Sequence, residues 1–209
     1  MSVVNPSQRQ KIVIVNTGCA NISSVRFALE RLGVEVDVSD DVNVIKSADK
    51  VFLPGVGTAA AAMASIEQKA LVETLQSLTQ PVLGVCLGMQ LMVETSAEGG
   101  FKGTGNIDCL NLMPGHVARM ESKGVRLPHM GWNTVTHNNE SLFKGIPQDT
   151  YFYFVHSFAV PEYEHTLASC TYGNAFSAAI NKDNFYGVQF HPERSGEAGA
   201  QLLTNFVNL

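Results

Sequence analysis

The pattern of hydrophobic and polar positions predicts alternating strands and helices in the first half of the chain. Short apolar, β-branched runs end at turn residues, as is typical of buried strands. Val25, Ala28, Leu29 and Leu32 recur with the i, i+3, i+4, i+7 spacing of a helix, and Gly33 follows as its terminator. The predicted strands are residues 11–15, 34–38, 51–53 and 82–85, and the predicted helices include residues 25–32, 59–78 and 87–95.

The second half of the chain is predicted to be mostly β. Residues 151–160 form a long aromatic run, and apolar runs follow at 167–172, 176–180 and 186–190 before a final helix at 197–207. No helical pattern separates these runs, so we expect antiparallel strands there. The whole pattern predicts one α/β domain over residues 1–209, in which a mainly parallel sheet is covered on both faces.

Composition and charge narrow the class of protein. The chain is 45% hydrophobic and 16% charged, which excludes a disordered chain, and its net charge of −5 disfavours nucleic acid and acidic membranes as partners. Residues 1–10 are polar, so we expect them to be flexible and not a secretory signal. No apolar run would span a membrane, and the four cysteines form no CxxC pair. We therefore expect free thiols and a cytoplasmic location.

One cysteine has an unusual setting. Cys86 lies in Gly84-Val85-Cys86-Leu87-Gly88, between a predicted strand and a predicted helix. This pattern is typical of a nucleophile elbow, a sharp turn that presents a reactive side chain at the end of a sheet strand. The helix dipole at that position favours a thiolate. The alternative is a packed structural thiol, which is the better interpretation for Cys109 and Cys170 because neither has flanking glycines.

A nucleophilic cysteine needs a base, and His191 is the best candidate of the six histidines. It ends an apolar run, Pro192 follows it, and Glu193 stands two residues away on the same side of an extended chain. The sequence therefore predicts a triad of Cys86, His191 and Glu193, in which the carboxylate fixes the imidazole tautomer. A capping or core histidine is the alternative. A metal site is disfavoured, since ligands at workable spacing are absent from the sequence.

Acyl transfer also needs donors for an oxyanion. Residues 53–57 (LPGVG) follow the third predicted strand, where a doubly wound sheet binds ligands, and their glycines leave backbone N–H groups open. Phosphate binding is the rival interpretation, but neither a GxGxxG nor a Walker pattern occurs. The third interpretation of this segment is an ordinary turn.

Together, the elbow at Cys86, the His191-Pro192-Glu193 sequence and residues 54–57 resemble the motifs of class-I (triad) glutamine amidotransferases. Within that family, residues 127–133 (LPHMGWN) and 153–157 (YFVHS) are similar to segments of the glutaminase subunits of imidazole glycerol phosphate synthase, of histidine biosynthesis. The resemblance covers nearly the whole chain, from about Ile12 to the last helix. It implies a flavodoxin-like, three-layer α/β/α fold, with no cofactor and no metal.

The resemblance also implies a reaction and a partner. Glutamine would be hydrolysed to glutamate and ammonia through a thioester on Cys86, with His191 as general base and acid and Glu193 as the orienting carboxylate. Ammonia would pass to a separate (β/α)8-barrel cyclase subunit of a heterodimer, which forms imidazole glycerol phosphate and aminoimidazole carboxamide ribotide. The remaining assignments that the resemblance implies are an oxyanion hole at Gly55, Val56, Gly57 and Leu87, glutamine binding by Gln90, Glu98, Ser157 and Phe158, and a cyclase-facing set of Asn21, Met130, Trp132, Tyr153 and Arg194.

Three other functions remain open at this point. Other triad amidotransferase subunits share the Cys86 and His191 motifs, and residues 127–133 argue against them. A cysteine peptidase of related fold would cleave peptides without glutaminase activity. A catalytically inactive scaffold is disfavoured by the intact triad. Trp132 and Tyr153 could also be core residues, and we interpret His129 and His156 as core histidines without a proton-transfer role.

Overall fold

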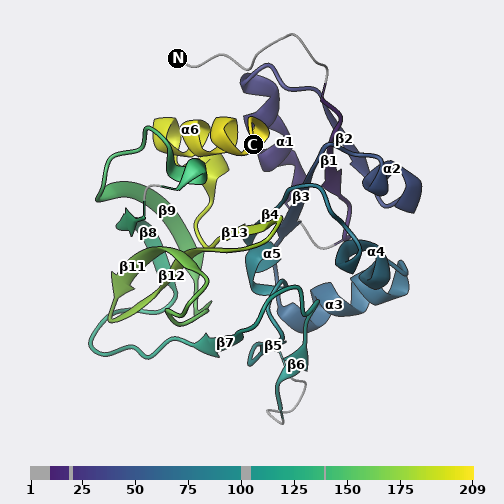
Figure 1. Cartoon of the computed structure of the whole chain (residues 1–209). Helices are drawn as coiled ribbons and strands as arrows, with labels where there is room; N and C mark the ends of the chain where they lie inside the picture. The colour runs from purple at the N-terminus through teal and green to yellow at the C-terminus, as the bar shows by residue number, and fades with distance from the viewer. Residues whose placement is uncertain (1–9, 19–20, 100–104, 139) are drawn as a thin grey trace.

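A nine-stranded mixed sheet runs through the computed structural model (Figure 1). The structure describes residues 10–18, 21–99, 105–138 and 140–209. Strands β1 to β4 pair in parallel, and β13 joins them in parallel beside β4. The other neighbours pair antiparallel. The spatial order is β2 (Val36–Ser39), β1 (Ile12–Val15), β3 (Lys50–Gly55), β4 (Val82–Cys86), β13 (Phe185–Val188), β12 (Asn174–Lys182), β11 (Thr166–Tyr172), β8 (His129–His137) and β9 (Thr150–His156).

Helices cover both faces of the parallel part, so the molecule has three layers. Ile12 and Ile14 of β1 belong to the core beneath α1 (Ile22–Arg31) and α6 (Gly196–Val207), whereas Val13 and Val15 belong to the core beneath α3 (Ala59–Gln68). In Figure 1, α1 and α6 lie on one side of the sheet, with α2, α3 and α4 on the other. The predicted α/β fold, with a parallel core and antiparallel additions in the second half, is confirmed. The shorter helices are α2 (Val42–Lys46), α4 (Val72–Gln76), α5 (Leu87–Gln90), η1 (Ser141–Phe143) and η2 (Pro192–Arg194).

A second, four-stranded sheet was not predicted from the sequence. Its strands are only two to four residues long, which is too short for an alternating pattern to show. The predicted strand at 151–160 divides at Ser157, so that its first part lies in the large sheet and its last part in the small one. The small sheet has the order β10 (Phe158–Ala159), β7 (His116–Arg119), β5 (Thr95–Ser96) and β6 (Ile107–Asp108).

Two predicted helices are shorter than their patterns indicated. The helix predicted at 59–78 is interrupted after Gln68, because Ala70 adopts a left-handed φ of 54°. The N–H groups of Ala70 and Leu71 donate to the carbonyls of Glu67 and Ile66 (2.9 and 3.0 Å), which is a Schellman termination with alanine in the usual glycine position.

The helix predicted at 87–95 is also wrong in length. It ends at Gln90, because Thr95 and Ser96 pair as a strand in the small sheet. Residues 87–93 are all buried, so their continuous hydrophobicity does not mark where the helix stops.

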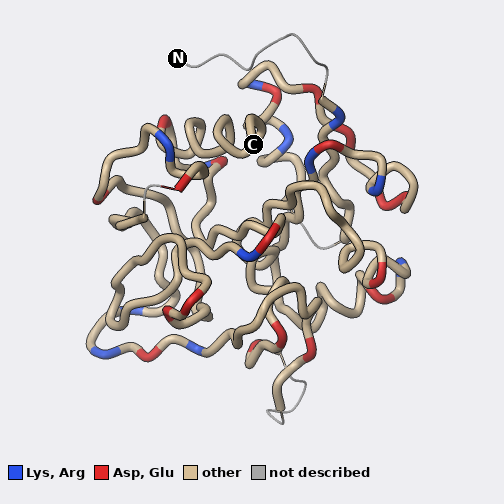
Figure 2. Tube along the Cα trace, in the orientation of Figure 1, with Lys and Arg blue, Asp and Glu red and all other residues tan. Residues whose placement is uncertain are grey.

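Charged residues are distributed along the whole trace, with both signs interspersed (Figure 2). None of the helices that the structure describes is long and apolar enough to cross a membrane. The N-terminal segment 1–10, predicted to be flexible, lies outside the described residues except for Gln10.

Candidate active site

Cys86 lies at the sharp turn between β4 and α5, and the strain of this turn is in the cysteine itself. Its φ is 53° and its ψ is −110°, a backbone conformation that residues with a side chain rarely adopt. The neighbouring glycines serve close packing instead. A Cβ on Gly88 would lie 1.8 Å from the Leu53 carbonyl oxygen, and one on Gly84 would lie 2.7 Å from the Gly88 backbone. The elbow therefore fits only because β3, β4 and α5 approach one another with no side chain between them.

His191 and Glu193 form a buried hydrogen-bonded pair beside this elbow. His191 follows β13, and the short helix η2 returns Glu193 to it, so that Nδ1–H donates to Oε1 at 2.8 Å. Burial of the imidazole lowers its pKa, but hydrogen bonds and charge interactions with Cys86 and Glu193 outweigh burial and raise the pKa of His191 to about 10. The carboxylate thus favours the imidazolium and fixes the tautomer that directs Nε2 away from Glu193.

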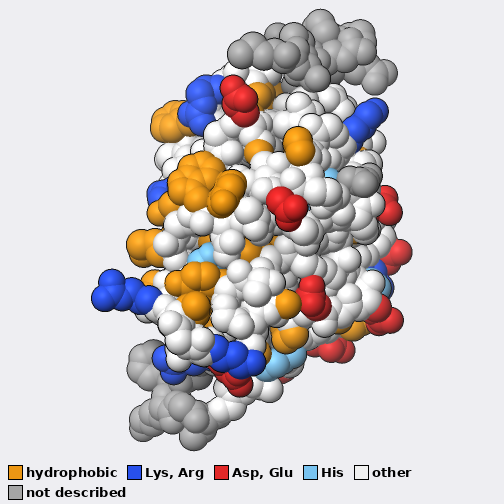
Figure 3. Space-filling view, turned by 90° about the vertical axis from the view of Figure 1, so that its left-hand side faces the viewer, with side chains coloured by type: hydrophobic (Ala, Val, Ile, Leu, Met, Phe, Trp, Pro, Cys, Tyr) orange, Lys and Arg blue, Asp and Glu red, His pale blue; other side chains and the backbone are white. Residues whose placement is uncertain are grey.

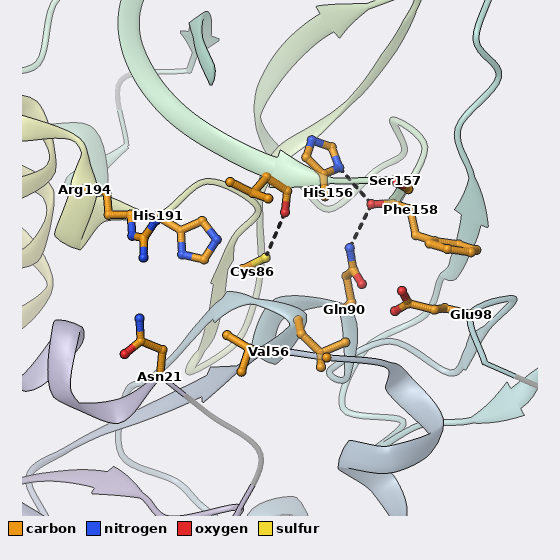
Figure 4. Close-up of a pocket in the computed structure, with 13 residues that line it drawn as sticks. Asn21, Val56, Cys86, Gln90, Glu98, His156, Ser157, Phe158, His191 and Arg194 are labelled. Atoms are coloured by element: carbon orange, nitrogen blue, oxygen red, sulfur yellow. Dashed lines mark hydrogen bonds between the residues drawn. The ribbon is translucent and has the colours of Figure 1, made fainter. Parts of the chain in front are cut away.

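The Cys86 sulfur has two further contacts. Its thiol donates weakly to the Val155 carbonyl at 3.9 Å, and the amide Nε2 of Gln189 donates to Sγ at 3.7 Å. The His191 imidazole lies beside the Cys86 side chain (Figure 4). A single thiol is therefore surrounded by an imidazole, an amide donor and a backbone carbonyl.

The thiol opens into a cavity of about 270 Å³, large enough for a small polar molecule. Its wall combines residues from the elbow, the loop after β3, the β9–β10 junction and the η2 segment (Figure 4). The lining residues are Asn21, Val56, Gly57, Cys86, Leu87, Gln90, Glu98, Val155, His156, Ser157, Phe158, His191 and Arg194.

Most residues singled out in the sequence lie at this cavity. Glu193 lies behind His191 and not in the wall, and Gly55 is the ladder partner of Cys86 at the end of β3. Asn21 and Arg194, expected to face a partner, line the cavity mouth as well. Both glycine-rich segments therefore converge on one site, as the elbow interpretation requires.

Two polar side chains in the wall have defined settings. The amide nitrogen of Gln90 donates to the Phe158 carbonyl and to Gln189 Oε1, both at 2.8 Å. Burial raises the pKa of Glu98, and a hydrogen bond from the backbone of Ala59, at the start of α3, partly opposes this. Glu98 therefore supplies a carboxylate to the cavity, and Gln90 supplies an amide oxygen.

His129 and His156, interpreted from the sequence as core histidines, are buried and form a hydrogen-bonded pair that reaches the same wall. His156 Nδ1 faces the Phe158 carbonyl at 2.8 Å, so this nitrogen carries the hydrogen. His156 Nε2 must then accept from His129 Nδ1, 3.0 Å away. Burial lowers the pKa of His129 to about 4 and that of His156 to about 3, so both are neutral.

The outer face of the β8–β9 pair presents apolar side chains. Met130 and Trp132 are 63% and 54% exposed, and Trp132 packs edge-on against Tyr153 with ring centroids 5.9 Å apart. Met130 stands opposite Val155, which lines the cavity, so this face leads to the site. Hydrophobic side chains gather on this side of the molecule (Figure 3). Trp132 is therefore not a core residue, and its exposure favours an interface.

Metal ligation finds no support in the described part of the chain. Among those residues, no group of three or more His, Cys, Asp or Glu side chains could hold a metal ion. The ionisable side chains of the cavity wall are the Cys86 thiol, the imidazoles of His156 and His191, the Glu98 carboxyl group and the Arg194 guanidinium.

Comparison with known proteins identifies the family. The profile of the family "Glutamine amidotransferase class-I" matches residues 13–209. The chain belongs to the class-I glutamine amidotransferase family. It is 57% identical to the imidazole glycerol phosphate synthase subunit HisH of Colwellia psychrerythraea, covering 95% of this chain and 93% of the relative. It is 58% identical to the protein of the same name from Haemophilus influenzae, covering 94% and 96%.

Solved structures agree with the fold of a class-I amidotransferase. A putative GMP synthase subunit from Thermoplasma acidophilum superposes with a TM-score of 0.71 at 19% identity, covering 96% of this chain and 94% of that one. At this identity the likeness establishes the fold alone. The resemblance inferred from the sequence motifs is thus confirmed at the level of the family.

Proposed function

We propose that the chain is the glutaminase subunit of an imidazole glycerol phosphate synthase. Glutamine hydrolysis is supported by the arrangement of Cys86, His191 and Glu193, which contact one another in sequence beside one cavity. The assignment to this synthase is supported by relatives of that name at 57% and 58% identity over nearly the whole chain.

The reaction begins with attack of the Cys86 thiolate on the carboxamide carbon of glutamine. A carbon–sulfur bond forms, and the carbonyl electrons move to oxygen. His191 then protonates the amide nitrogen, the carbon–nitrogen bond breaks and ammonia leaves a thioester on Cys86. Water then attacks the thioester carbon, a carbon–oxygen bond forms and one proton of the water passes to His191. The carbonyl re-forms and the carbon–sulfur bond breaks, which frees the Cys86 thiolate and glutamic acid; the acid gives its carboxyl proton to solvent as glutamate. Glu193 holds the imidazole in one tautomer through both steps.

The oxyanion of each tetrahedral intermediate needs backbone donors near the sulfur. Leu87 directly follows the nucleophile, and it lines the same cavity as Val56 and Gly57. Gly57 has a left-handed φ of 94°, and Val56 is 41% exposed. We assign the oxyanion hole to the segment from Gly55 to Gly57 together with Leu87, with the first segment aligned by the partner and its bound ligand.

The polar groups of the cavity match the functional groups of glutamine. Gln90 offers its amide oxygen to an N–H group of the substrate, and Glu98 offers a carboxylate to the α-ammonium group. The backbone at Ser157 and Phe158 completes the wall. These roles account for the polar side chains in the cavity wall.

Ammonia made at Cys86 has to reach a second active site before it is protonated by water. We propose that a (β/α)8-barrel cyclase subunit covers the cavity mouth and the face formed by Met130, Trp132 and Tyr153. Asn21 and Arg194 would contact it at the rim. The heterodimer would then convert the ammonia into imidazole glycerol phosphate and aminoimidazole carboxamide ribotide.

A cytoplasmic location and one domain over residues 1–209 complete the proposal. Cys86, Cys109 and Cys170 are free and buried, as suits a reducing compartment. The nine-stranded sheet continues from the first half of the chain into the second, which supports one folding unit.

The test is to co-express the chain with a barrel cyclase, purify the complex and measure two products. We expect glutamate release that rises when the cyclase and its nucleotide ligand are present, and glutamine-dependent cyclisation. Equal glutaminase rates with and without the partner would refute partner control. A lack of glutamate release in the complex would refute the proposed activity itself.

A further inference from the structure

Gln189 is a fully buried polar residue for which the triad alone gives no role. It directly follows β13, two residues before His191, and its backbone N–H donates to the Ala178 carbonyl at 2.9 Å. Its side chain lies in the core between the elbow and the wall of the cavity. A buried amide is stable there only when its donors and acceptor are paired.

The Phe158 carbonyl determines the directions of the side-chain hydrogen bonds of Gln90 and Gln189. The Phe158 oxygen can only accept, so the nitrogen of the Gln90 amide must face it. The same nitrogen lies 2.8 Å from one end of the Gln189 amide, which must therefore be its oxygen. The NH2 group of Gln189 is then the end that lies 3.7 Å from Cys86 Sγ. An N–H donor is thus directed at the sulfur.

This donor matters more to the thiolate than to the thiol. The neutral thiol donates its hydrogen to the Val155 carbonyl at 3.9 Å. A thiolate has no hydrogen to donate and needs donors from its surroundings instead. Burial disfavours the thiolate form of the other buried cysteines, and it raises the pKa of Cys109 and of Cys170 to about 12.

We propose that Gln189 is a further catalytic residue, whose side-chain amide donates a hydrogen bond to the Cys86 thiolate while its oxygen orients Gln90 toward the substrate. Both contacts use one amide plane, so the nucleophile and the substrate-binding amide are held in fixed relation. In Figure 4, the Gln90 oxygen lies on the side of Glu98, within the cavity. The role in glutamine hydrolysis rests on the proposed function, whereas the contact with the sulfur does not.

The test measures the reactivity of Cys86 without using glutamine. Iodoacetamide alkylation is followed by peptide mass spectrometry from pH 4 to pH 9 in the full chain, with Gln189→Met and Gln189→Asn. Methionine removes the donor, and asparagine withdraws it by one methylene. We expect the pH midpoint of Cys86 alkylation to rise by about one unit in both variants, a tenfold smaller thiolate fraction below the midpoint.

Other groups near the sulfur have to stay constant for this interpretation. Burial lowers the pKa of His191, but contacts with Cys86 and Glu193 outweigh it and raise the pKa to about 10, and neither substitution at Gln189 removes those contacts. Glu193 lies behind His191, and Glu98 lies in the cavity wall. All variants share these groups, so a difference in midpoint reports on Gln189.

Gln80→Met is the matched control, because it makes the same change at a glutamine whose amide donates to the Ile45 carbonyl at 3.0 Å and does not contact Cys86. Slow alkylation of Cys109 and Cys170 verifies that each variant is folded. If one Gln189 variant does not fold, the other still provides the comparison. A wild-type midpoint in either folded variant would overturn the proposal. If the wild type fails to hydrolyse glutamine in the complex, the proposed function falls while the midpoint comparison still decides the role of Gln189.

Discussion

Lowering the pH from 7 to 5 should destabilise the folded chain through two buried histidines, His129 and His156. Burial lowers the pKa of His129 to about 4 and that of His156 to about 3, whereas both return to about 6.5 in the unfolded chain. Between pH 6.5 and pH 4, both histidines therefore bind protons more readily in the unfolded state than in the folded state. The stability that these residues contribute is present above pH 6.5 and is lost as the pH falls toward the folded values.

The size of the effect at pH 5 depends little on the exact folded pKa, since both values lie below 5. At pH 5 the unfolded state gains about 2 kcal/mol from each histidine, or about 4 kcal/mol for the pair. This is a large part of a typical stability of about 5–15 kcal/mol. His191 acts in the opposite direction, because its pKa is raised to about 10. Between pH 7 and pH 5 the stabilisation from His191 grows by less than about 1 kcal/mol, so it offsets only a small part of the loss from His129 and His156.

Urea unfolding at pH 7 and at pH 5 measures this loss. In His129→Gln, the loss of free energy of unfolding between the two pH values should be about 2 kcal/mol smaller than in the wild type. His165→Gln is the control, because His165 is partly exposed at the surface and lies outside the buried pair. An equal loss in the wild type and in His129→Gln would refute the reasoning.

Three substitutions test the elbow, the proposed triad and the proposed partner face. Gly88→Ala places a methyl group 1.8 Å from the Leu53 carbonyl oxygen, so we expect several kcal/mol of destabilisation in urea unfolding, or no soluble protein. Glu193→Gln should lower kcat for glutamine hydrolysis by about 100-fold or more, measured as glutamate release in the complex, because the tautomer of His191 is no longer fixed. Trp132→Ala should weaken cyclase binding about tenfold or more in titration calorimetry, whereas Phe27→Ala, exposed on α1, should not.

The arrangement of Cys86, His191 and Glu193 at one site could be predicted because each of its parts is encoded locally. The glycines around Cys86 lie within two residues of it, and Glu193 lies two residues from His191. Close packing and a turn therefore leave a signature in short segments. The sequence did not reveal that the strain falls on Cys86, or that Gly88 leaves room for Leu53 of β3, because that contact joins residues 35 positions apart.

The buried polar network could not be predicted for the same reason. Gln189 is separated by 99 residues from Gln90 and by 103 residues from Cys86, so no local pattern links them. The available signal was a glutamine inside an otherwise apolar run, Tyr186 to Phe190, which is unusual for a buried strand end. Pairing partners could only be assigned once β13 was placed beside β4.

The helix boundaries show a different limit. Ala70 terminates α3 in a left-handed conformation that glycine usually supplies, so the amphipathic pattern continued past the true end. A short helix with every side chain buried, such as α5, has no polar face from which to read its length. The hydrophobic pattern therefore places a helix correctly but does not show where it ends.

The position of β13 joins the proposed nucleophile to the proposed partner face. Parallel pairing of Val188 with Val85 brings the carboxyl ends of β13 and β4 together, and hence His191 to Cys86. The backbone of His191 is bound in turn to Tyr153 of β9, since His191 N–H donates to the Tyr153 carbonyl at 2.9 Å. Ser195 Oγ reinforces this link, accepting from Tyr153 N–H at 3.0 Å and donating to the His191 carbonyl at 2.7 Å. Because Tyr153 also packs against the exposed Trp132, a displacement of β9 at that face either breaks these bonds or moves His191.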